Sequence, residues 1–475
     1  MGMHFDFAAT ASETFATCNP ARPAQSVGRY AVPSAEETAA IVAKANSAAM
    51  QWARVPGLER GQRLDAFLDA VVERVDDIAE AVTLEQGKIL AEAKAETLKG
   101  CAEGRFMVGE ASRMGATPTA SGRPDFSNQI LRRPRGVIFC IAPWNFPAMT
   151  PLRKICPAIA FGNAAIVKPS QFTPAAAFLL ADIAKAFFPE NLVQVAMVGG
   201  SAASKLVAES AIHGVSFTGS VEVGRLVYAA AASNLIPVQL ELGGKNAAIV
   251  NDTDDLEAAV KQIAGAAFQT GGQRCTAISR VLVRKDLAKK VGELLASSAD
   301  AIVLGDGMQE DSQMGPLCNQ PHWEGVIAHT SKAIGEGAKP LAGGGPRDGA
   351  GPEGGYFFCP TVLTDVAHES TAAQVEIFGP VLSVLEYETF DEAMQMLNGT
   401  EFGLTSALFS NNSAYVQRFL RESQNGMLHV NHGTIPDNNM PFGGIKNSGV
   451  GAYSVGPTAI NFYTSEHSAY VTWGN

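Results

Sequence analysis

Between residues 136 and 241 the chain alternates short β-rich runs with longer helical ones, and this alternation constrains the fold more than any other feature. The β-rich runs are 137–141, 164–167, 193–198, 215–217 and 238–240. The stretches between them are long enough for crossover helices, at 153–161, 174–187, 202–209 and 221–232. Such alternation builds a parallel sheet covered by helices on both faces, and a nucleotide binds such a sheet at the carboxyl ends of its strands. We therefore predict an α/β fold of the Rossmann type with a nucleotide site at that edge.

Two further regions flank this predicted sheet. Apolar residues recur every three or four positions from 34 to 107, which predicts a helical layer. A second α/β pattern begins after residue 241 and runs to about 431, with a helix expected at 256–268 and a strand at 281–283. We therefore expect a second α/β unit to follow the first.

Two segments stand outside the helix–strand alternation. Residues 128–134 form a candidate extended strand, whose expected partner is another subunit or the chain's own tail. In that tail, residues 459–473 alternate like a pair of strands. Together they predict a β arm.

The composition indicates a large globular enzyme. The 475 residues favour two or three domains, and 46% hydrophobic with 17% charged residues allow extensive cores. The net charge of −11 is spread without acidic or basic blocks, which disfavours nucleic acid and anionic membranes as partners. No apolar stretch reaches the roughly 18 to 20 residues that span a bilayer, and residues 1–6 do not resemble a secretory signal.

Seven cysteines are scattered along the chain without a CxxC pair. This arrangement argues against a disulfide framework and against a zinc site. Reduced thiols are typical of the cytoplasm, so we expect a cytoplasmic protein.

One cysteine and one glutamate lie in matching glycine-rich settings. Cys275 ends the run GGQRC, and Glu241 begins the run ELGGK. A thiolate can bond to an electrophilic carbon, and a nearby carboxylate can deprotonate the water that later breaks this bond. A lone cysteine is more often a small buried hydrophobe, so it is the pairing with Glu241 that predicts covalent chemistry.

Other motifs stand at predicted strand ends or in glycine-rich turns. The run FTGSVEVG at 217–224 crosses from a strand to a helix, where backbone N–H groups and the helix dipole favour a pyrophosphate. Asn145, held between two prolines in PWNFP, can donate its amide to a developing oxyanion, as can the backbone N–H of Cys275. Lys168 in VKPS places an ammonium at the same sheet edge. Each motif alone is also consistent with an ordinary turn or surface residue.

Two later motifs complete the set. Glu376 and Phe378 in EIFGP offer a carboxylate for ribose hydroxyls and a ring for a planar cofactor. The loop PFGGIKNSG at 441–449 has little side-chain bulk and can pass under a ligand. Both segments also occur as plain turns.

The eight histidines form no HxxxH or HExxH spacing, so no metal site is predicted. We interpret them as structural or surface residues. A substrate contact is the alternative for His432, which lies near the candidate pocket loop.

Taken in order, the motifs PWNFP, VKPS, FTGS, ELGGK, GQRC, EIFGP and PFGGIKNSG resemble those of the aldehyde dehydrogenase superfamily along nearly the whole chain. The resemblance implies oxidation of an aldehyde to an acid with NAD or NADP, through a thiohemiacetal and then a thioester. It also implies a homodimer or homotetramer joined by a domain-swapped β hairpin.

The resemblance further implies a division into domains. We expect a dinucleotide-binding domain made of residues 1–118 and 138–241, and a catalytic domain of residues 242–432. Oligomerisation strands are expected at 119–137 and 458–475. A glycine-rich loop, 433–457, is expected to return to the first domain.

Carried over by position, Cys275 resembles the nucleophile, Asn145 the oxyanion donor and Glu241 the base for thioester hydrolysis. Lys154 is expected to support the proton path. The residues that resemble cofactor ligands are Pro143, Trp144, Lys168, Gln171, Thr218, Gly219, Ser220, Gly224, Leu242, Glu376 and Phe378. Family members that pass the acyl group to coenzyme A typically lack the base, so Glu241 favours a hydrolytic enzyme.

Two positions depart from the family pattern. The run Gly-Ala-Tyr at 451–453 stands where the family often has Gly-Arg-Glu, so a proton relay has to run through Glu241 alone or through water. Gln171 stands where a glutamate would favour NAD over NADP, so the cofactor preference stays open.

The substrate is the least determined feature. Residues 149–154 resemble the succinate-semialdehyde branch, in which an arginine aligned with Arg153 binds the substrate carboxylate. Gln269 replaces the second carboxylate-binding arginine of that branch, and Arg274 beside the nucleophile is the alternative. The run GQRCT is also similar to α-ketoglutaric semialdehyde dehydrogenases.

We therefore predict a short aldehyde with a distal acidic group as the substrate. The alternative is a broad aliphatic or aromatic aldehyde dehydrogenase in which both arginines are structural. A coenzyme A-acylating enzyme and a non-catalytic use of the fold are less favoured.

Overall fold

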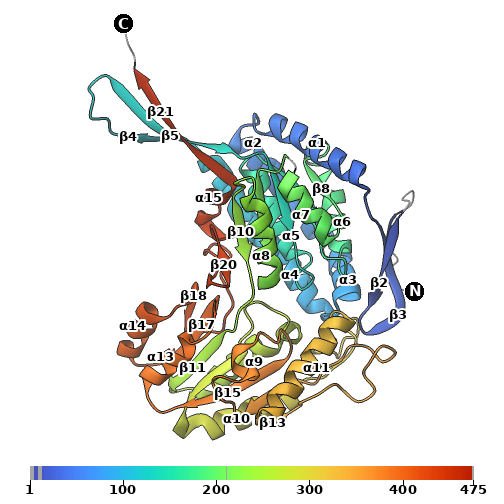
Figure 1. The fold of residues 1–475 in the computed structure, drawn as a ribbon, viewed down its shortest axis with the longest axis vertical. Helices are drawn as coiled ribbons and strands as arrows, with labels where there is room; N and C mark the ends of the chain where they lie inside the picture. The colour runs from blue at the N-terminus through green and yellow to red at the C-terminus, as the bar shows by residue number, and fades with distance from the viewer. Residues whose placement is uncertain (1–4, 9–12, 210, 473–475) are drawn as a thin grey trace.

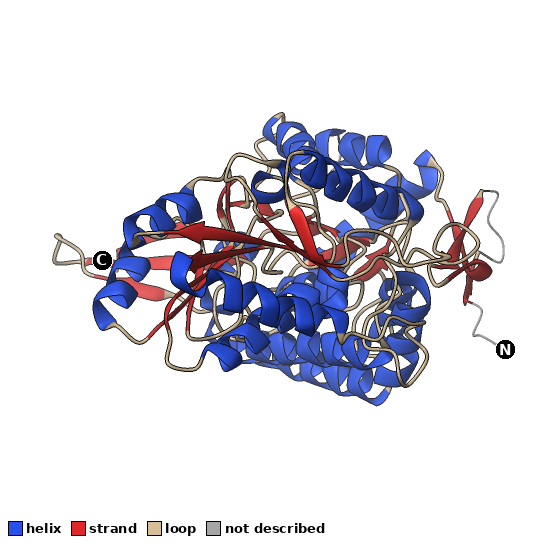
Figure 2. Ribbon diagram, turned by 90° about the horizontal axis from the view of Figure 1, so that it is seen from below, coloured by secondary structure: helices blue, strands red, loops and turns tan. Residues whose placement is uncertain are grey.

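The computed structural model describes residues 5–8, 13–209 and 211–472. A six-stranded sheet occupies the upper part of the molecule in Figure 1 and a seven-stranded sheet the lower part. Figure 2 shows the strands lying between layers of helices. Within the described residues, no helix is both long and apolar enough to cross a lipid bilayer. Residues 1–4 of the predicted first domain and 473–475 of the predicted tail strands lie outside the described residues.

The first large sheet has the strand order β20-β10-β9-β6-β7-β8. Its five parallel strands are β6 (Val137–Ile141), β7 (Ala164–Lys168), β8 (Val193–Val195), β9 (Gly214–Thr218) and β10 (Val238–Glu241). The predicted parallel sheet is confirmed. Strands β7 and β8 follow β6 on one side, and β9 and β10 lie on its other side. The strand order therefore reverses between β6 and β9, and ligands bind such folds at the carboxyl ends of the two strands that flank this point.

The edge strand β20 (Gly449–Val450) is antiparallel to β10 and pairs Gly449 with Glu241. A strand of two residues is too short to show an alternation of apolar and polar side chains, so the sequence did not predict β20. Its pairing brings the glycine-rich segment against the end of β10. The same segment holds β19 (Ile445–Lys446), which pairs with β16 (Phe402–Gly403), and the short 3₁₀ helix η2 (Gly456–Thr458).

The crossover helices are α5 (Met149–Ala160), α6 (Ala175–Ala184), α7 (Gly200–Glu209) and α8 (Val221–Ala232). Helix α8 begins where predicted, because Ser220 caps it by accepting a hydrogen bond from the N–H of Val223. Helix α5 begins at Met149, before the predicted start at residue 153. Its first N–H groups are satisfied by Glu96 from another helix, a contact that no local pattern reveals.

A small sheet, in the order β1-β3-β2, and four helices precede the first large sheet. They are β1 (Phe5–Phe7), β2 (Thr14–Asn19), β3 (Arg22–Ala31), α1 (Ala35–Trp52), α2 (Gly57–Glu73), α3 (Val75–Gln86) and α4 (Leu90–Arg113). The predicted helical layer is confirmed, and Ser34 and Glu37 form both hydrogen bonds of a capping box at the start of α1. Trp52, Phe67 and Phe139 share one apolar core between these helices and the sheet.

The second large sheet has the order β13-β14-β15-β12-β11-β17-β18. Its strands are β11 (Ala247–Asp252), β12 (Arg280–Arg284), β13 (Lys339–Ala342), β14 (Thr361–Thr364), β15 (Val381–Tyr387), β17 (Thr405–Ser410) and β18 (Met427–Val430). All neighbours are parallel except β13 and β14. The predicted second α/β pattern is therefore confirmed.

The helices of this second part lie around its sheet (Figure 2). They are α9 (Leu256–Phe268), α10 (Lys285–Asp300), α11 (Gln320–Gly335), α12 (Thr371–Gln374), α13 (Phe390–Asn398) and α14 (Ser413–Glu422). Helix α9 has the predicted bounds. It is followed directly by the 3₁₀ helix η1 (Gln269–Gly272), which leads to Cys275.

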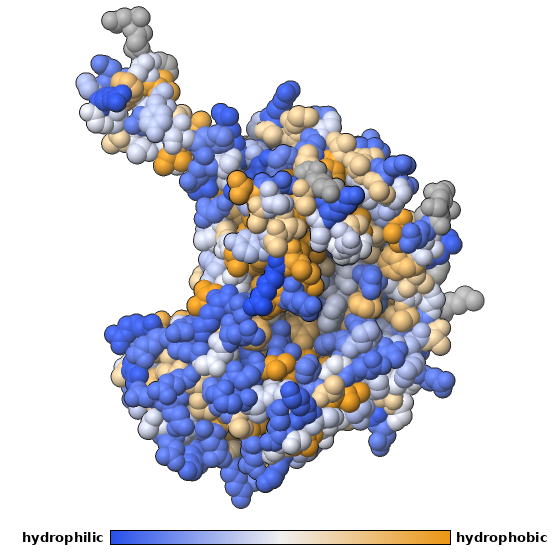
Figure 3. All heavy atoms as spheres, in the orientation of Figure 1, coloured by the Kyte–Doolittle hydropathy of each residue, from blue (hydrophilic) through white to orange (hydrophobic). Residues whose placement is uncertain are grey.

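A three-stranded β arm projects from the body, as Figures 1 and 3 show. It consists of β4 (Thr117–Thr119), β5 (Phe126–Pro134) and β21 (Thr464–Thr472), in the order β21-β5-β4. Strands β5 and β21 are antiparallel over their whole length, from Pro134 opposite Thr464 to Phe126 opposite Thr472. The predicted strand at 128–134 thus pairs with the chain's own tail.

The prediction of a strand pair in the tail is wrong for its first half. Residues Ile460–Tyr463 form the helical turn α15, and one strand, β21, follows. Phe462 and Tyr463 are adjacent and both buried. Successive residues of a strand point to opposite faces, whereas a helical turn lets both rings enter the same core.

Candidate active site

A cavity of about 480 Å³ lies between the two large sheets. In Figure 3 apolar residues gather toward the middle of this face, whereas the part over the seven-stranded sheet is mostly hydrophilic. The predicted site residues in the cavity wall are Pro143, Trp144, Asn145, Arg153, Thr218, Gly219, Ser220, Glu241, Leu242, Gln269, Arg274, Cys275, Glu376 and Phe378. Residues far apart in the chain therefore meet at one cavity.

Five predicted residues are not part of this wall. Lys154 is buried behind it, and Lys168 ends β7 beside Ile141 of β6, at the same sheet edge. Gln171 is exposed, and Gly224 lies in the first turn of α8 against Leu242. His432 lines a second cavity of about 530 Å³, described below.

Cys275 reaches the cavity through a left-handed turn. Thr270, Gly271 and Gly272 have φ values of 58°, 62° and 68°. At Gly272 a Cβ atom would lie 2.2 Å from the backbone oxygen of Gly379, so this position requires glycine. The glycine pattern in GGQRC therefore serves a close approach between η1 and the segment that carries Glu376 and Phe378.

Cys275 is partly buried. Burial raises its pKa to about 11; the charge of Arg153 opposes this shift, and Glu241 adds to it. The resting thiol is therefore protonated at neutral pH. To act as a nucleophile it has to lose a proton within the site.

Glu241 ends β10 and is buried, and its Oε2 atom has no hydrogen-bond partner among the described residues. Burial raises the pKa of its carboxyl to about 8, against the opposing charges of Arg153 and Lys154. A carboxyl group with a pKa near neutrality can both accept and release a proton at working pH.

Lys154 connects α5 to β9. Its Nζ donates to Ser216 Oγ at 2.8 Å and to Thr218 Oγ1 at 3.0 Å. Burial lowers its pKa to about 8, with the charge of Glu241 opposing that shift. The ammonium thus lies within electrostatic range of Glu241 and can exchange protons near neutral pH.

Asn145 lies in the loop between β6 and α5. Its Nδ2 group donates to the backbone oxygen of Gln273 at 2.9 Å, two residues before the cysteine. The amide therefore faces the segment that carries Cys275. This is the side from which a donor could reach an oxyanion formed at the cysteine.

The segment 376–378 closes another side of the cavity. Glu376 Oε1 accepts from the N–H of Gly244 at 2.8 Å, and burial raises the pKa of this carboxyl to about 7. Phe378 has a φ of 56°, and its ring packs edge-on against Trp144 with 5.4 Å between ring centres. A carboxylate and two aromatic rings can bind a sugar and a planar ring.

His322, at the start of α11, is a wall residue that the sequence analysis missed. Its Nε2 is 2.8 Å from the backbone oxygen of Phe378, and burial lowers its pKa to about 4. It is therefore neutral at physiological pH, and its N–H donates to the strained Phe378 backbone. Paired-histidine spacing does not reveal such a residue, and the helix start before Pro321 and His322 was the signal available.

The two predicted arginines have different partners. Arg153 forms two hydrogen bonds with the Glu103 carboxylate, and its guanidinium lies 4.3 Å above the Phe442 ring centre. Arg274 instead donates to Gln269 Oε1 and to Thr276 Oγ1, which are neutral. The cavity wall also includes Lys99, whose Nζ donates to the backbone oxygen of Pro436 at 2.8 Å.

The second cavity adjoins the first, because both are lined by Glu92, Gln269 and Ile435. There His432 pairs with His429, with 3.3 Å between their Nδ1 atoms. Within the described residues, no group of three or more histidine, cysteine, aspartate or glutamate side chains is placed to hold a metal ion.

The model of the aldehyde dehydrogenase family matches residues 7–468. The chain belongs to the aldehyde dehydrogenase family. The predicted family and α/β fold are therefore confirmed, and the protein is an aldehyde dehydrogenase enzyme.

Two curated relatives illustrate the range of this aldehyde dehydrogenase's similarities. It is 34% identical to an alpha-ketoglutaric semialdehyde dehydrogenase of Bacillus subtilis, over 95% of this chain and 93% of that one. It is 37% identical to a betaine aldehyde dehydrogenase of Cereibacter sphaeroides, over 92% of this chain and 89% of that one. One of these relatives is named for an anionic aldehyde and the other for a cationic one.

Solved structures of the family show the same fold. A betaine aldehyde dehydrogenase of Staphylococcus aureus in complex with NAD+ matches with a TM-score of 0.93 and 29% identity, over 97% of this chain and 92% of that one. A 3,6-anhydro-L-galactose dehydrogenase in complex with NADP matches with a TM-score of 0.94 and 30% identity, over 99% of this chain and all of that one.

Proposed function

We propose that this aldehyde dehydrogenase oxidises a short aldehyde bearing a distal carboxylate to the corresponding acid, without coenzyme A. The observation that carries the chemistry is that Cys275, Glu241 and Asn145 line one cavity. In the proposed reaction the Cys275 thiol gives its proton to solvent in the cavity, and the sulfur adds to the aldehyde carbon to form a thiohemiacetal. The Asn145 amide and the Cys275 backbone N–H donate to the oxygen that becomes negative.

A bound NAD or NADP would supply the hydride acceptor that the conversion of the thiohemiacetal on Cys275 to a thioester requires. The Glu241 carboxylate takes a proton from water, whose oxygen attacks the thioester carbon, and the acid leaves with the thiolate regenerated. Lys154 holds and passes protons behind Glu241 through its contacts with Ser216 and Thr218. The presence of Glu241 favours water over coenzyme A as the acyl acceptor.

The residues present fit a dinucleotide cofactor. At Gly243 a Cβ atom would lie 1.9 Å from Glu376 Oε2, so the missing side chain keeps room for that carboxylate beside the cavity. Thr218, Gly219 and Ser220 stand at the start of α8, where N–H groups favour phosphate oxygens. Lys168, at the neighbouring strand end, would bind the adenosine ribose, and Gln171 leaves both NAD and NADP as candidates.

The charges at the substrate end support an anionic substrate. The charge of Arg153 is matched by Glu103, whereas no carboxylate in the described part of the chain forms an ion pair with Arg274. Burial lowers the pKa of Lys99; the charge of Glu103 opposes this shift, whereas the charges of Arg153 and Arg274 add to it. Arg274 is therefore proposed as the main carboxylate donor, with Lys99 adding positive charge.

The β arm and the cysteines support two further proposals. Strands β5 and β21 form an exposed ribbon of the kind that joins subunits, so we propose a homodimer or homotetramer. All seven cysteines are free, which is consistent with a reducing, cytoplasmic setting.

The test compares nicotinamide reduction with succinate semialdehyde and with an uncharged aldehyde of equal length. Each is measured with NAD and with NADP, without coenzyme A. A strong preference for the charged aldehyde supports the proposed substrate class and determines the cofactor. Equal or better turnover of the neutral aldehyde contradicts it and supports a broad-specificity enzyme.

A further inference from the structure

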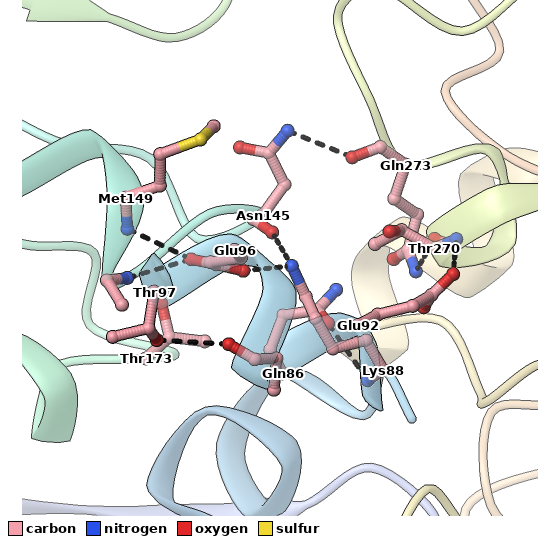
Figure 4. A network of polar contacts seen from close by, with 12 residues as sticks. Gln86, Lys88, Glu92, Glu96, Thr97, Asn145, Met149, Thr173, Thr270 and Gln273 are labelled. Atoms are coloured by element: carbon pink, nitrogen blue, oxygen red, sulfur yellow. Dashed lines mark hydrogen bonds and ion pairs between the residues drawn. The ribbon is translucent and has the colours of Figure 1, made fainter. Parts of the chain in front are cut away.

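A buried ion pair lies under the loop that carries Asn145. Lys88 follows α3 and Glu96 lies on α4, and their side chains are 0% and 1% exposed. Figure 4 shows the Lys88 ammonium between the Glu96 carboxylate and the backbone oxygen of Asn145. Neither residue belongs to a motif that the sequence analysis singled out.

Lys88 holds the first half of the loop. Its Nζ donates to the Asn145 backbone oxygen at 2.7 Å and lies 4.1 Å from the centre of the Phe146 ring. A desolvated ammonium over an aromatic face is attracted by the ring's negative potential. Both contacts fix the backbone at and next to Asn145.

Glu96 holds the second half. Its Oε1 accepts from the N–H groups of Ala148 and Met149 at 2.9 and 3.2 Å. Helix α5 begins at this point with Ala148 as its N-cap residue, and no side chain of its own caps it. The carboxylate therefore satisfies the helix N-terminus from a neighbouring helix and interacts favourably with its dipole.

The contacts of Lys88 and of Glu96 together determine where the Asn145 side chain points. With the backbone fixed at 145 and at 148–149, the Asn145 amide is directed to the Gln273 oxygen, beside Cys275 (Figure 4). An ion pair in the interior contributes little net stability compared with apolar residues of similar size, so stability alone does not account for it.

We propose that Lys88 and Glu96 are positioning residues, which hold the Asn145 amide where it stabilises the oxyanion formed at Cys275. This inference rests on the proposed role of Asn145. The ion pair does not contact the reacting atoms, and it acts only through the loop.

A double-mutant cycle on kcat tests this mechanism, using the aldehyde that gives the fastest nicotinamide reduction. Asn145→Ala is expected to lower kcat about 100-fold, as the loss of one oxyanion donor does. Lys88→Met is expected to lower kcat on the order of tenfold, because misplacing a catalytic group by a fraction of an ångström is costly. In the double variant, Lys88→Met is expected to cause no further loss.

The outcomes separate the inference from the proposed function. If Asn145→Ala leaves kcat unchanged, the oxyanion role in the proposed function is wrong. If Asn145→Ala lowers kcat but Lys88→Met does not, or if the two losses multiply, the positioning role is wrong and the proposed function stands. The KM for the cofactor is expected to change little in all variants.

Two variants guard against a purely structural effect. Tyr30→Phe removes a buried hydrogen bond to Glu85 but no contact of Lys88, Glu96 or Asn145, and is expected to lower the thermal unfolding midpoint without changing kcat. Glu96→Gln keeps an acceptor for Ala148 and Met149, and it takes the place of Lys88→Met in the cycle if that variant does not fold. Non-additivity with Asn145→Ala supports the proposal for either variant, and additivity contradicts it.

Discussion

The guanidinium of Arg153 forms two hydrogen bonds with the carboxylate of Glu103, from Nε at 2.8 Å and from Nη2 at 2.7 Å. Both side chains are buried, so the charge of Arg153 is matched inside the protein before any substrate binds. Arg274 lines the same cavity with neutral hydrogen-bond partners, and the carboxylate of Glu92 acts on it only through its charge, without forming an ion pair. The two arginines that the sequence offers as carboxylate ligands are therefore not equivalent.

Arg274→Gln is expected to raise the KM for a carboxylate-bearing aldehyde roughly 10- to 150-fold. A hydrogen bond to a charged group contributes about 1.5–3 kcal/mol, and the glutamine removes the charge. The kinetics of a neutral aldehyde of equal length serve as the control and should change little. A similar loss with both aldehydes would show that Arg274 supports the fold of the Cys275 segment instead.

Cys275→Ala is expected to reduce aldehyde oxidation at least about 10⁴-fold, because the covalent route is lost. Cys359→Ala is the matched control, since that thiol is partly exposed and away from the cavity wall. Steady-state nicotinamide reduction measures both. Residual activity of Cys275→Ala near the wild-type rate would contradict a cysteine nucleophile.

The rate of thioester hydrolysis is expected to rise with pH through about 8 and then level off. The pKa of Glu241 is raised to about 8, and only its ionised form accepts a proton from water. Glu241→Gln should slow hydrolysis by about 10²–10⁴-fold and remove this step in the profile. Stopped-flow measurements should then show a burst of one reduced nicotinamide per site followed by slow turnover. A variant with no burst and unchanged turnover would exclude Glu241 as the base.

Gly243→Ala is expected to raise the KM for the cofactor about tenfold, or about 1.4 kcal/mol of binding. The new Cβ would lie 1.9 Å from Glu376 Oε2, so the carboxylate has to move. Gly265→Ala on α9 is the control, because its Cβ would meet no atom within 4 Å and alanine favours the helix. If both variants bind the cofactor equally well, Glu376 is not part of the cofactor site.

The thermal unfolding midpoint is expected to depend on pH through Glu85. Its carboxyl accepts from Thr17, Tyr30 and Ala175, yet burial raises its pKa from 4.5 to about 7. Between pH 4.5 and 7 the Glu85 carboxyl is protonated in the folded protein and ionised in the unfolded chain. The stability that Glu85 contributes is therefore fully present below about pH 4.5 and is lost as the pH rises through 7. Glu85→Gln should therefore show a smaller decline in midpoint from pH 5 to 7.5. The exposed Glu386→Gln should keep the wild-type decline.

The parallel sheet and the residues that meet at its edge could be predicted from the sequence pattern alone. Strand–helix alternation leaves few arrangements, and the carboxyl ends of parallel strands share one edge, so Asn145, Lys168, Thr218 and Glu241 could be placed near one another without coordinates. The sequence marked the runs around Cys275 and Glu241 only as glycine-rich, and the structure gives the reason: a Cβ at Gly272 would meet the Gly379 backbone and one at Gly243 the Glu376 carboxylate.

Which charges are already paired could be seen only once the chain was folded in three dimensions. Arg153 lies 50 positions from Glu103, and Lys88 lies 57 from Asn145, so no local period connects them. The start of α5 and the helical turn at Ile460–Tyr463 were misjudged for the same reason, since a distant carboxylate and a shared core set them. Local sequence patterns indicate which backbone conformation a segment prefers. The state of a buried charge depends instead on the residues that the fold places beside it, because removing a charge from water is costly unless a partner is there.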